Sequence, residues 1–137
     1  MKGDTKMAKT INEVLSYIDS VKPNRFSKEQ KIAWLSTLDH DIKRKIIDTH
    51  EGGESVTFNG YGDETPANTE LLMPEPYSEA YAHWLSAQMD LYSGELTRYN
   101  NSIGLFNTVY SEFENEYIRT HKPKGYGKRF SMSGWSL

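Results

Sequence analysis

The amino-acid sequence predicts a mainly α-helical protein, with short N-terminal helices and a long helical stretch in the C-terminal half. Two capping boxes each precede a short amphipathic stretch, and apolar residues recur at helical spacing from Tyr77 to Tyr117. A strand-like pattern occurs only within residues 51–76. We therefore expect helices on both sides of a loop or short β-hairpin insertion around residues 51–76.

The N-terminal third predicts two helices. Thr10 and Glu13 form the first capping box, whose side chains satisfy the first free amides of a helix, and this helix should end near Pro23. Ser27 and Gln30 open the second, which should end near His50 because consecutive glycines favour a C-terminal cap. Its apolar stripe consists of Ile32, Leu35, Leu38, Ile42 and Ile46, widened by Trp34 and Ile47. Asp39, His40 and the neighbouring charges are expected on its other faces.

Residues 51–76 predict a docking loop. Val56-Thr57-Phe58 is strand-like and Asn59-Gly60 is a hairpin-turn signal, but residues 61–65 make a poor partner strand, so any hairpin is short. Three prolines follow in residues 66–76. A long irregular segment in a small domain is typically functional or disordered. Three apolar residues expected to be exposed favour docking over disorder: Leu71, Leu72 and Met73.

The stretch from Tyr77 to His121 favours one long helix, with or without a kink. The apolar phase carries through Gly94 and Asn100, where a loop would normally reset it. Two helices broken near Asn100 are the alternative, since glycine propagates a helix poorly. An unbroken helix would be roughly 60 Å long, too long for one small monomer to cover. We therefore expect a subunit interface along its aromatic stripe, at Tyr92, Tyr99, Phe106, Tyr110 and Phe113.

The chain divides into a flexible N-terminus (1–9), a helical domain (10–121) and an extended C-terminal arm (122–137). The arm interleaves cations and aromatics and lacks periodicity, which is typical of a segment ordered by a partner. The partner-contact candidates in it are Tyr126, Lys128, Arg129, Phe130 and Trp135.

Charge is unevenly spread along the chain, although the net charge is only −3. Residues 51–76 hold six acids and no Lys or Arg, whereas residues 121–137 hold four Lys or Arg and no acid. Blocks of opposite sign predict contacts between these two segments, within one subunit or between neighbours. Two solvated, flexible segments are the alternative.

Several functional classes are disfavoured. The absence of cysteine excludes disulfides and thiolate zinc sites, and no apolar run of about 18 residues predicts a membrane span. The four histidines of the chain lie outside any metal-ligand motif, so no catalytic, cofactor or metal site is predicted. An enzyme would require His50, Glu51 and Glu54 to converge on another ligand. The nucleic-acid alternative is stronger, because cations and aromatics of the arm could contact phosphates and bases.

The stretches that carry a family resemblance are "TINEVLSYIDSVKPN", "KIAWLSTLDHDIKRKIIDTHEG", "TELLMPEPYSEAYAHWLSAQMDLYSGELTRYNNSIGLFNTVYSEF" and "RTHKP". Together they resemble head–tail connector (adaptor) proteins from the capsid modules of tailed phages and prophages common in Firmicutes. The likeness covers about residues 10–123 and is most specific in residues 70–113. The insertion at 51–76 and the glycine-rich basic end depart from the shorter connectors.

The resemblance implies a structural, non-enzymatic protein of the virion neck, assembled in the bacterial host cytoplasm. It implies a ring of copies that docks to the portal and bridges to a stopper or tail-completion protein. Such a ring extends the DNA channel, so non-specific contact with packaged DNA is expected and contact with a membrane is not. A terminase small subunit is another packaging-module candidate, but the sequence shows no helix-turn-helix.

Overall fold

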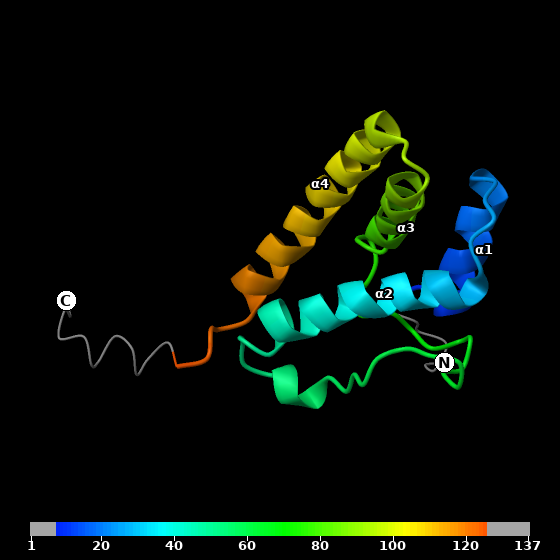
Figure 1. Ribbon diagram of the computed structural model, residues 1–137. Coiled ribbons are helices and arrows are strands. Elements are labelled where there is room, and N and C mark those ends of the chain that lie inside the picture. The colour runs from blue at the N-terminus through cyan, green and yellow to red at the C-terminus, as the bar shows by residue number, and fades with distance from the viewer. Residues whose placement is uncertain (1–7, 126–137) are drawn as a thin grey trace.

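The computed structural model describes residues 8–125 and confirms a mainly helical fold (Figure 1). Its elements are α1 (Ile11–Val21), α2 (Lys28–Ile42) with a π-helical turn (Lys43–Ile47), a short 3-10 helix (Gly53–Ser55), α3 (Glu79–Tyr92) and α4 (Leu96–Thr120). Residues 8–125 contain no β-strand, only two isolated bridges. None of the helices in this range combines the length and apolarity needed to cross a bilayer.

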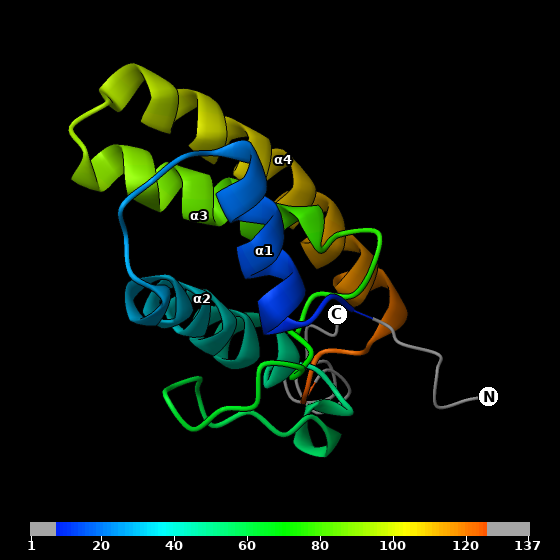
Figure 2. The same ribbon diagram turned by 90° about the vertical axis from the view of Figure 1, so that its right-hand side faces the viewer.

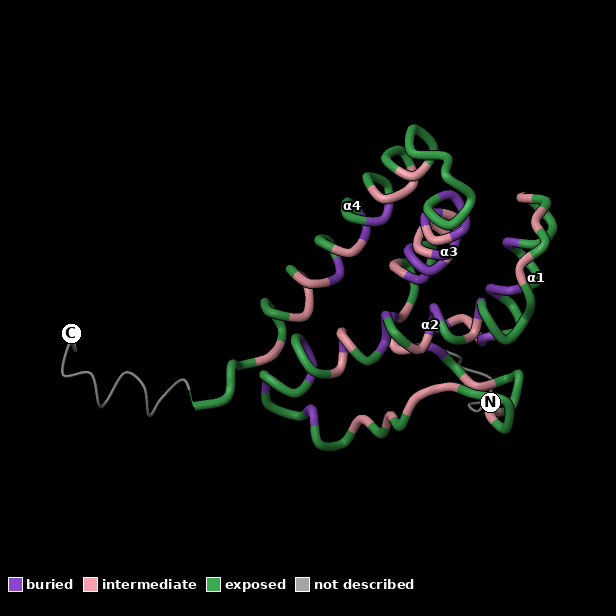
Figure 3. Tube along the Cα trace, viewed as in Figure 1, coloured by how far each residue is buried: buried purple, intermediate pink, exposed green. Residues whose placement is uncertain are grey.

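Helices α3 and α4 form an antiparallel hairpin that stands on α2. In Figure 1 α3 lies between α1 and α4, and both views show residues 51–76 returning beneath α2 toward the start of α1 (Figures 1 and 2). The buried faces of the four helices turn toward one another (Figure 3). One apolar core therefore joins all four helices, and the long loop closes its lower side.

The predicted helix starts are confirmed. The Glu13 amide donates to Thr10 Oγ1 at 3.1 Å and the Thr10 amide donates to Glu13 Oε1 at 2.9 Å, which completes the capping box of α1. Ser27 Oγ accepts from the Gln30 amide at 3.0 Å at the start of α2. These bonds satisfy amides that a helix itself leaves free, so the caps fix where α1 and α2 begin.

The long C-terminal helix is confirmed as α4, but the favoured single helix from Tyr77 to His121 is wrong. Two helices are present, as in the alternative, and they are separated at Gly94 and not near Asn100. The chain reverses at Ser93-Gly94-Glu95, where Gly94 has φ +75°. The Glu95 amide donates to Asp90 O at 2.9 Å and the Gly94 amide to Leu91 O at 3.2 Å. This is the Schellman arrangement, and glycine takes its left-handed position without a Cβ penalty. The apolar period continues across the turn because both helices direct their apolar faces at each other.

The predicted β-hairpin is also wrong, whereas the loop is present. Residues 56–65 form no strand, although Gly60 turns the chain with φ +93°. Polar groups of Tyr61, which would belong to the second strand, are engaged by α2 instead: its amide donates to Ser36 Oγ at 3.1 Å and its hydroxyl donates to Asp39. Contacts with α2 therefore replace the cross-strand pairing.

Candidate partner-binding site

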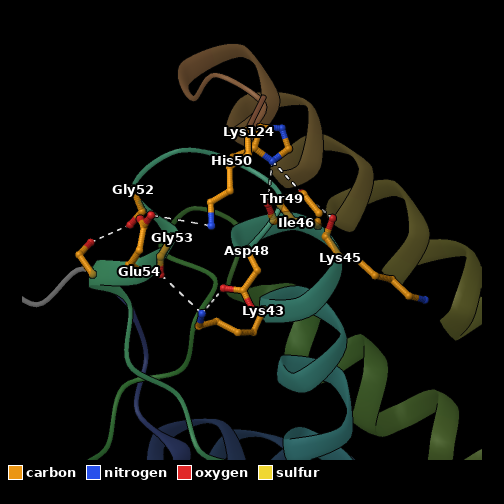
Figure 4. A network of polar contacts seen from close by, with 11 residues as sticks. Lys43, Lys45, Ile46, Asp48, Thr49, His50, Gly52, Gly53, Glu54 and Lys124 are labelled. Atoms are coloured by element: carbon orange, nitrogen blue, oxygen red, sulfur yellow. Dashed lines mark hydrogen bonds and ion pairs between the residues drawn. The ribbon is translucent and has the colours of Figure 1, made fainter. Parts of the chain in front are cut away.

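The C-terminal segment is anchored where α2 passes into the loop (Figure 4). His50 and Pro123 form an isolated antiparallel bridge. The Glu51 amide donates to Lys122 O at 2.8 Å, and the Lys124 amide donates to Thr49 O at 2.9 Å. Residues 122–124 thus have a defined position against residues 49–51, at this end of α2.

The π-helical turn positions Thr49 and His50, which form part of this anchor. His50 Nδ1 lies 2.7 Å from Ile46 O and 3.0 Å from Thr49 Oγ1, while Thr49 Oγ1 also donates to Lys45 O at 2.9 Å. The His50 ring is buried and meets Tyr117 of α4 edge-on, with ring centroids 5.6 Å apart. His50 is therefore a packed helix-end residue that joins α2 to α4. Within residues 8–125, no three His, Cys, Asp or Glu side chains are grouped to hold a metal.

Two glycines allow the chain to turn after α2 and to stay in contact with the π-helical turn. Gly52 has φ +91°, which favours glycine. Gly53 is buried against the π-helical turn, and a Cβ built on it would lie 2.3 Å from Ile47 O. Even alanine would clash with backbone there, so the second glycine is required by space and the first by backbone conformation.

The opposite charge blocks meet at this junction. Lys124 Nζ lies 3.8 Å from Glu54 Oε2, and both side chains are well exposed. Lys43 pairs with Asp48, and its Nζ lies 3.5 Å from Gly53 O. An exposed pair such as Lys124–Glu54 contributes little stability, so the backbone bonds are the principal anchor.

The expectation that the apolar residues of the loop are exposed is wrong for two of the three. Leu71 and Met73 are buried in the core, and Leu72 is half-buried against it. The Leu71 amide donates to Lys9 O at 3.0 Å, and the Ile11 amide donates to Thr69 O at 2.9 Å, so this part of the loop is fastened to the start of α1. Leu71 and Met73 are core residues and offer no docking surface.

Asp39 is the polar centre that sequence reasoning missed. It was expected on a solvent face of α2, but its side chain is fully buried. It accepts hydrogen bonds from Tyr81 Oη at 2.7 Å, from the Leu72 amide at 3.1 Å and from Tyr61 Oη. Tyr81 Oη in turn accepts from the Met73 amide at 2.7 Å. One carboxylate therefore joins α2, α3 and two parts of the loop.

Burial shapes the titration of this centre. Loss of solvent raises the pKa of Asp39 to about 6, against the opposing effect of its three donors. Burial and the Asp39 charge raise the pKa of Tyr61 and of Tyr81 above the ordinary tyrosine range. Both phenols therefore remain donors to Asp39 at neutral pH.

What the loop presents to solvent is negative charge. The six acids of the loop are all exposed: Glu51, Glu54, Asp63, Glu64, Glu70 and Glu75. Glu75 pairs with Lys9 at 2.7 Å and Glu54 lies near Lys124. The other four acids, Glu51, Asp63, Glu64 and Glu70, form no ion pair within residues 8–125. The surface that residues 51–76 present to solvent is thus acidic.

The aromatic residues expected at a subunit interface divide into two groups. Phe106 and Phe113 are buried inside the subunit, where Phe106 meets Trp84 at 5.2 Å between ring centroids and Phe113 meets Tyr77 at 5.9 Å. They are core residues because α3 folds back and covers this stripe. Tyr99 and Tyr110 are half-buried, whereas Tyr92 remains 67% exposed and stacks on Trp34.

The predicted contact residues of the arm lie outside the described residues: Tyr126, Lys128, Arg129, Phe130 and Trp135. Comparison of the chain with protein-family models, with curated proteins and with solved structures finds no match.

Proposed function

We propose that this chain is a structural head–tail connector of the virion neck, which forms a ring, docks to a portal and bridges to a stopper or tail-completion protein. The observation that carries the proposal is the anchored exit of a basic, aromatic segment beside an acidic surface. A segment that leaves a packed helical body from a fixed point is suited to reach a partner. The sequence resemblance supplies the identity of that partner.

Exposed apolar side chains support contacts between copies. Five large ones lie on α1 or around the α3–α4 turn: Tyr17, Val21, Leu91, Tyr92 and Leu96. Apolar residues concentrated at one end of a charged molecule are typical of a protein–protein interface. We place the contact between neighbouring copies there, with Tyr92 retained from the predicted interface. Leu72 and the arm residues remain the candidates for portal contact.

Electron microscopy of the full chain mixed with the portal of the same capsid module tests this proposal. We expect a ring of connector density on the portal. A chain that ends at Gly125 keeps the His50–Pro123 anchor and should keep its helical circular dichroism, but should no longer attach. Unchanged attachment of the shortened chain would count against the arm, and the absence of any ring on the portal would count against a connector.

Nucleic-acid binding through the arm is the alternative, and the composition of residues 122–137 supports it. Its signature is a DNA affinity that falls steeply with salt and that loses part of this dependence when Lys128 and Arg129 are replaced by Ala. The acidic surface beside the exit of the arm disfavours this alternative, since it repels phosphates. We propose no catalytic, cofactor-binding or metal-binding role for this chain.

A further inference from the structure

A groove lies beside the middle of α2, apart from the C-terminal anchor. It is open, has a volume of about 710 Å³, and is lined by Ser36 and His40 of α2 and by residues 59–66 of the loop. Asp63 and Glu64 belong to its lining, are exposed, and form no ion pair within residues 8–125. The groove therefore carries two free negative charges.

Aromatic rings also adjoin the groove: His40 and Tyr61 line it, and Phe58 contacts both of them. Phe58 meets His40 edge-on at 4.8 Å between ring centroids and meets Tyr61 edge-on at 5.0 Å. Phe58 and Tyr61 are both half-buried. The backbone at Gly60 lies close to the His40 ring, because a Cβ on this glycine would lie 3.2 Å from His40 Nε2. Carboxylates next to partly exposed rings suit a peptide that carries both cations and aromatic residues, through ion pairs, ring contacts and cation–π contacts.

The chain itself contains a peptide of this chemistry. Residues 126–130 read Tyr-Gly-Lys-Arg-Phe, and residues 121–137 contain no acid. We propose that the groove of one copy binds residues 126–130 of a second copy. Lys128 and Arg129 pair with Asp63 and Glu64, and the flanking Tyr126 and Phe130 meet the rings of Phe58 and Tyr61.

We assign residues 126–130 to the groove of a second copy because the proposed function requires contacts between copies. The contact is then heterologous, arm to groove, and such contacts close into rings when the rotation permits.

The inference rests on the self-assembly part of the proposed function and needs no portal. Cross-linking of the full chain tests it directly. Chains labelled with ¹⁴N or ¹⁵N are mixed, treated with a carbodiimide that joins amines to carboxylates at contact distance, and digested for mass spectrometry. We expect Lys128 joined to Asp63 or Glu64 in peptide pairs of mixed isotope. Pairs of one isotope alone place the arm on its own chain and overturn the proposal, as does the absence of such pairs.

Charge exchange adds a second test. Asp63→Lys with Glu64→Lys, or Lys128→Glu with Arg129→Glu, should each weaken self-association in sedimentation by about tenfold or more at low salt. Combining the four changes should restore it. The matched control, Glu112→Lys with Glu114→Lys on α4, alters the net charge equally and should leave association unchanged. Failure of the exchange to restore association, with the helical circular dichroism intact, overturns the groove as the receptor. If these tests overturn the arm–groove contact but the unaltered chain still forms rings on the portal, the inference fails and the proposed function stands.

Discussion

The α3–α4 hairpin and the 51–76 loop are stabilised in opposite ways. Large apolar and aromatic side chains hold the hairpin together, among them Phe106, Val109 and Phe113 on α4. The loop has fewer such residues, of which Leu71 and Met73 are buried in the core. Backbone hydrogen bonds to α1 and the single carboxylate of Asp39 also hold it. The hairpin is thus secured by many small additive contacts, whereas the loop depends on a polar centre that loses its function if one group is removed.

The largest expected effect is on the hairpin. Phe113→Ala should lower the free energy of unfolding by about 3–5 kcal/mol, because it removes a buried ring and leaves a cavity against Tyr77. Ile118→Ala on the same helix is the control, since Ile118 is 46% exposed and its loss should cost within about 0.5 kcal/mol. Urea denaturation followed by circular dichroism measures both. Equal midpoints for the two variants would contradict the hairpin packing.

The polar centre should respond almost as strongly. Asp39→Ala leaves the hydroxyl of Tyr81 and the amide of Leu72 without their acceptor, which we expect to cost about 3 kcal/mol of stability at neutral pH. Asp41→Ala is the matched control, because Asp41 forms surface pairs with Arg44 and Lys45 and should cost less than about 1 kcal/mol. The same urea titration compares them. A loss for Asp39→Ala no larger than that of its control would show that the loop does not depend on this carboxylate.

The pH dependence of stability sharpens this contrast. Because the folded-state pKa of Asp39 is raised to about 6 from 3.8, the folded protein binds a proton more tightly than the unfolded chain. The contribution of this group is therefore fully present below pH 3.8 and is lost as pH rises through about 6, a loss of about 3 kcal/mol. Asp39→Asn cannot titrate, so its stability relative to the wild type should rise over that interval. A difference between the two proteins that stays constant from pH 4 to pH 7 would contradict the raised pKa.

Substitution of the two glycines at the start of the loop should have the smallest effects on stability, and the effect at Gly53 should exceed that at Gly52. Gly53→Ala places a Cβ against Ile47 O and should cost about 1–3 kcal/mol, the usual range for overpacking. Gly52→Ala meets no atom within 4 Å and incurs only the backbone strain of φ +91°, about 1 kcal/mol. Thermal unfolding of the two variants measures the order. The reverse order would mean that backbone conformation outweighs the close approach.

The predictable parts of the fold are those where the chain follows local rules. The caps at Thr10 and Ser27 and the apolar stripe of α2 are readable from spacing, because helix periodicity and side-chain capping act within a few residues. The turn at Gly94 was missed because the apolar period of a helical hairpin can match that of one continuous helix. Periodicity reports which face is buried, but not what covers it.

The polar centre could not be predicted for a different reason. Nothing near Asp39 in the sequence marks it as buried, since its donors lie 22, 33 and 42 residues away. The burial of Leu71 and Met73 is unpredictable for the same reason. The sequence does not show that this part of the loop is attached to the start of α1, so it gives no sign that these apolar residues are covered. The acidic character of the loop can be predicted from composition alone, and the structure adds that all six acids are exposed to solvent. The arm–groove contact remains a proposal.

The anchor at His50 and Pro123 also determines how the chain moves. Its inter-segment backbone bonds, from Glu51 to Lys122 O and from Lys124 to Thr49 O, belong to no sheet within residues 8–125 and lie at exposed positions. Such bonds open by local fluctuation at a free energy well below that of global unfolding, so their amides should exchange with deuterium early. Residues 122–125 can therefore detach from residues 49–51 while Tyr117 stays packed on His50 and the core stays closed. A fixed subunit thereby gains an exit whose direction can adapt to the position of its neighbour.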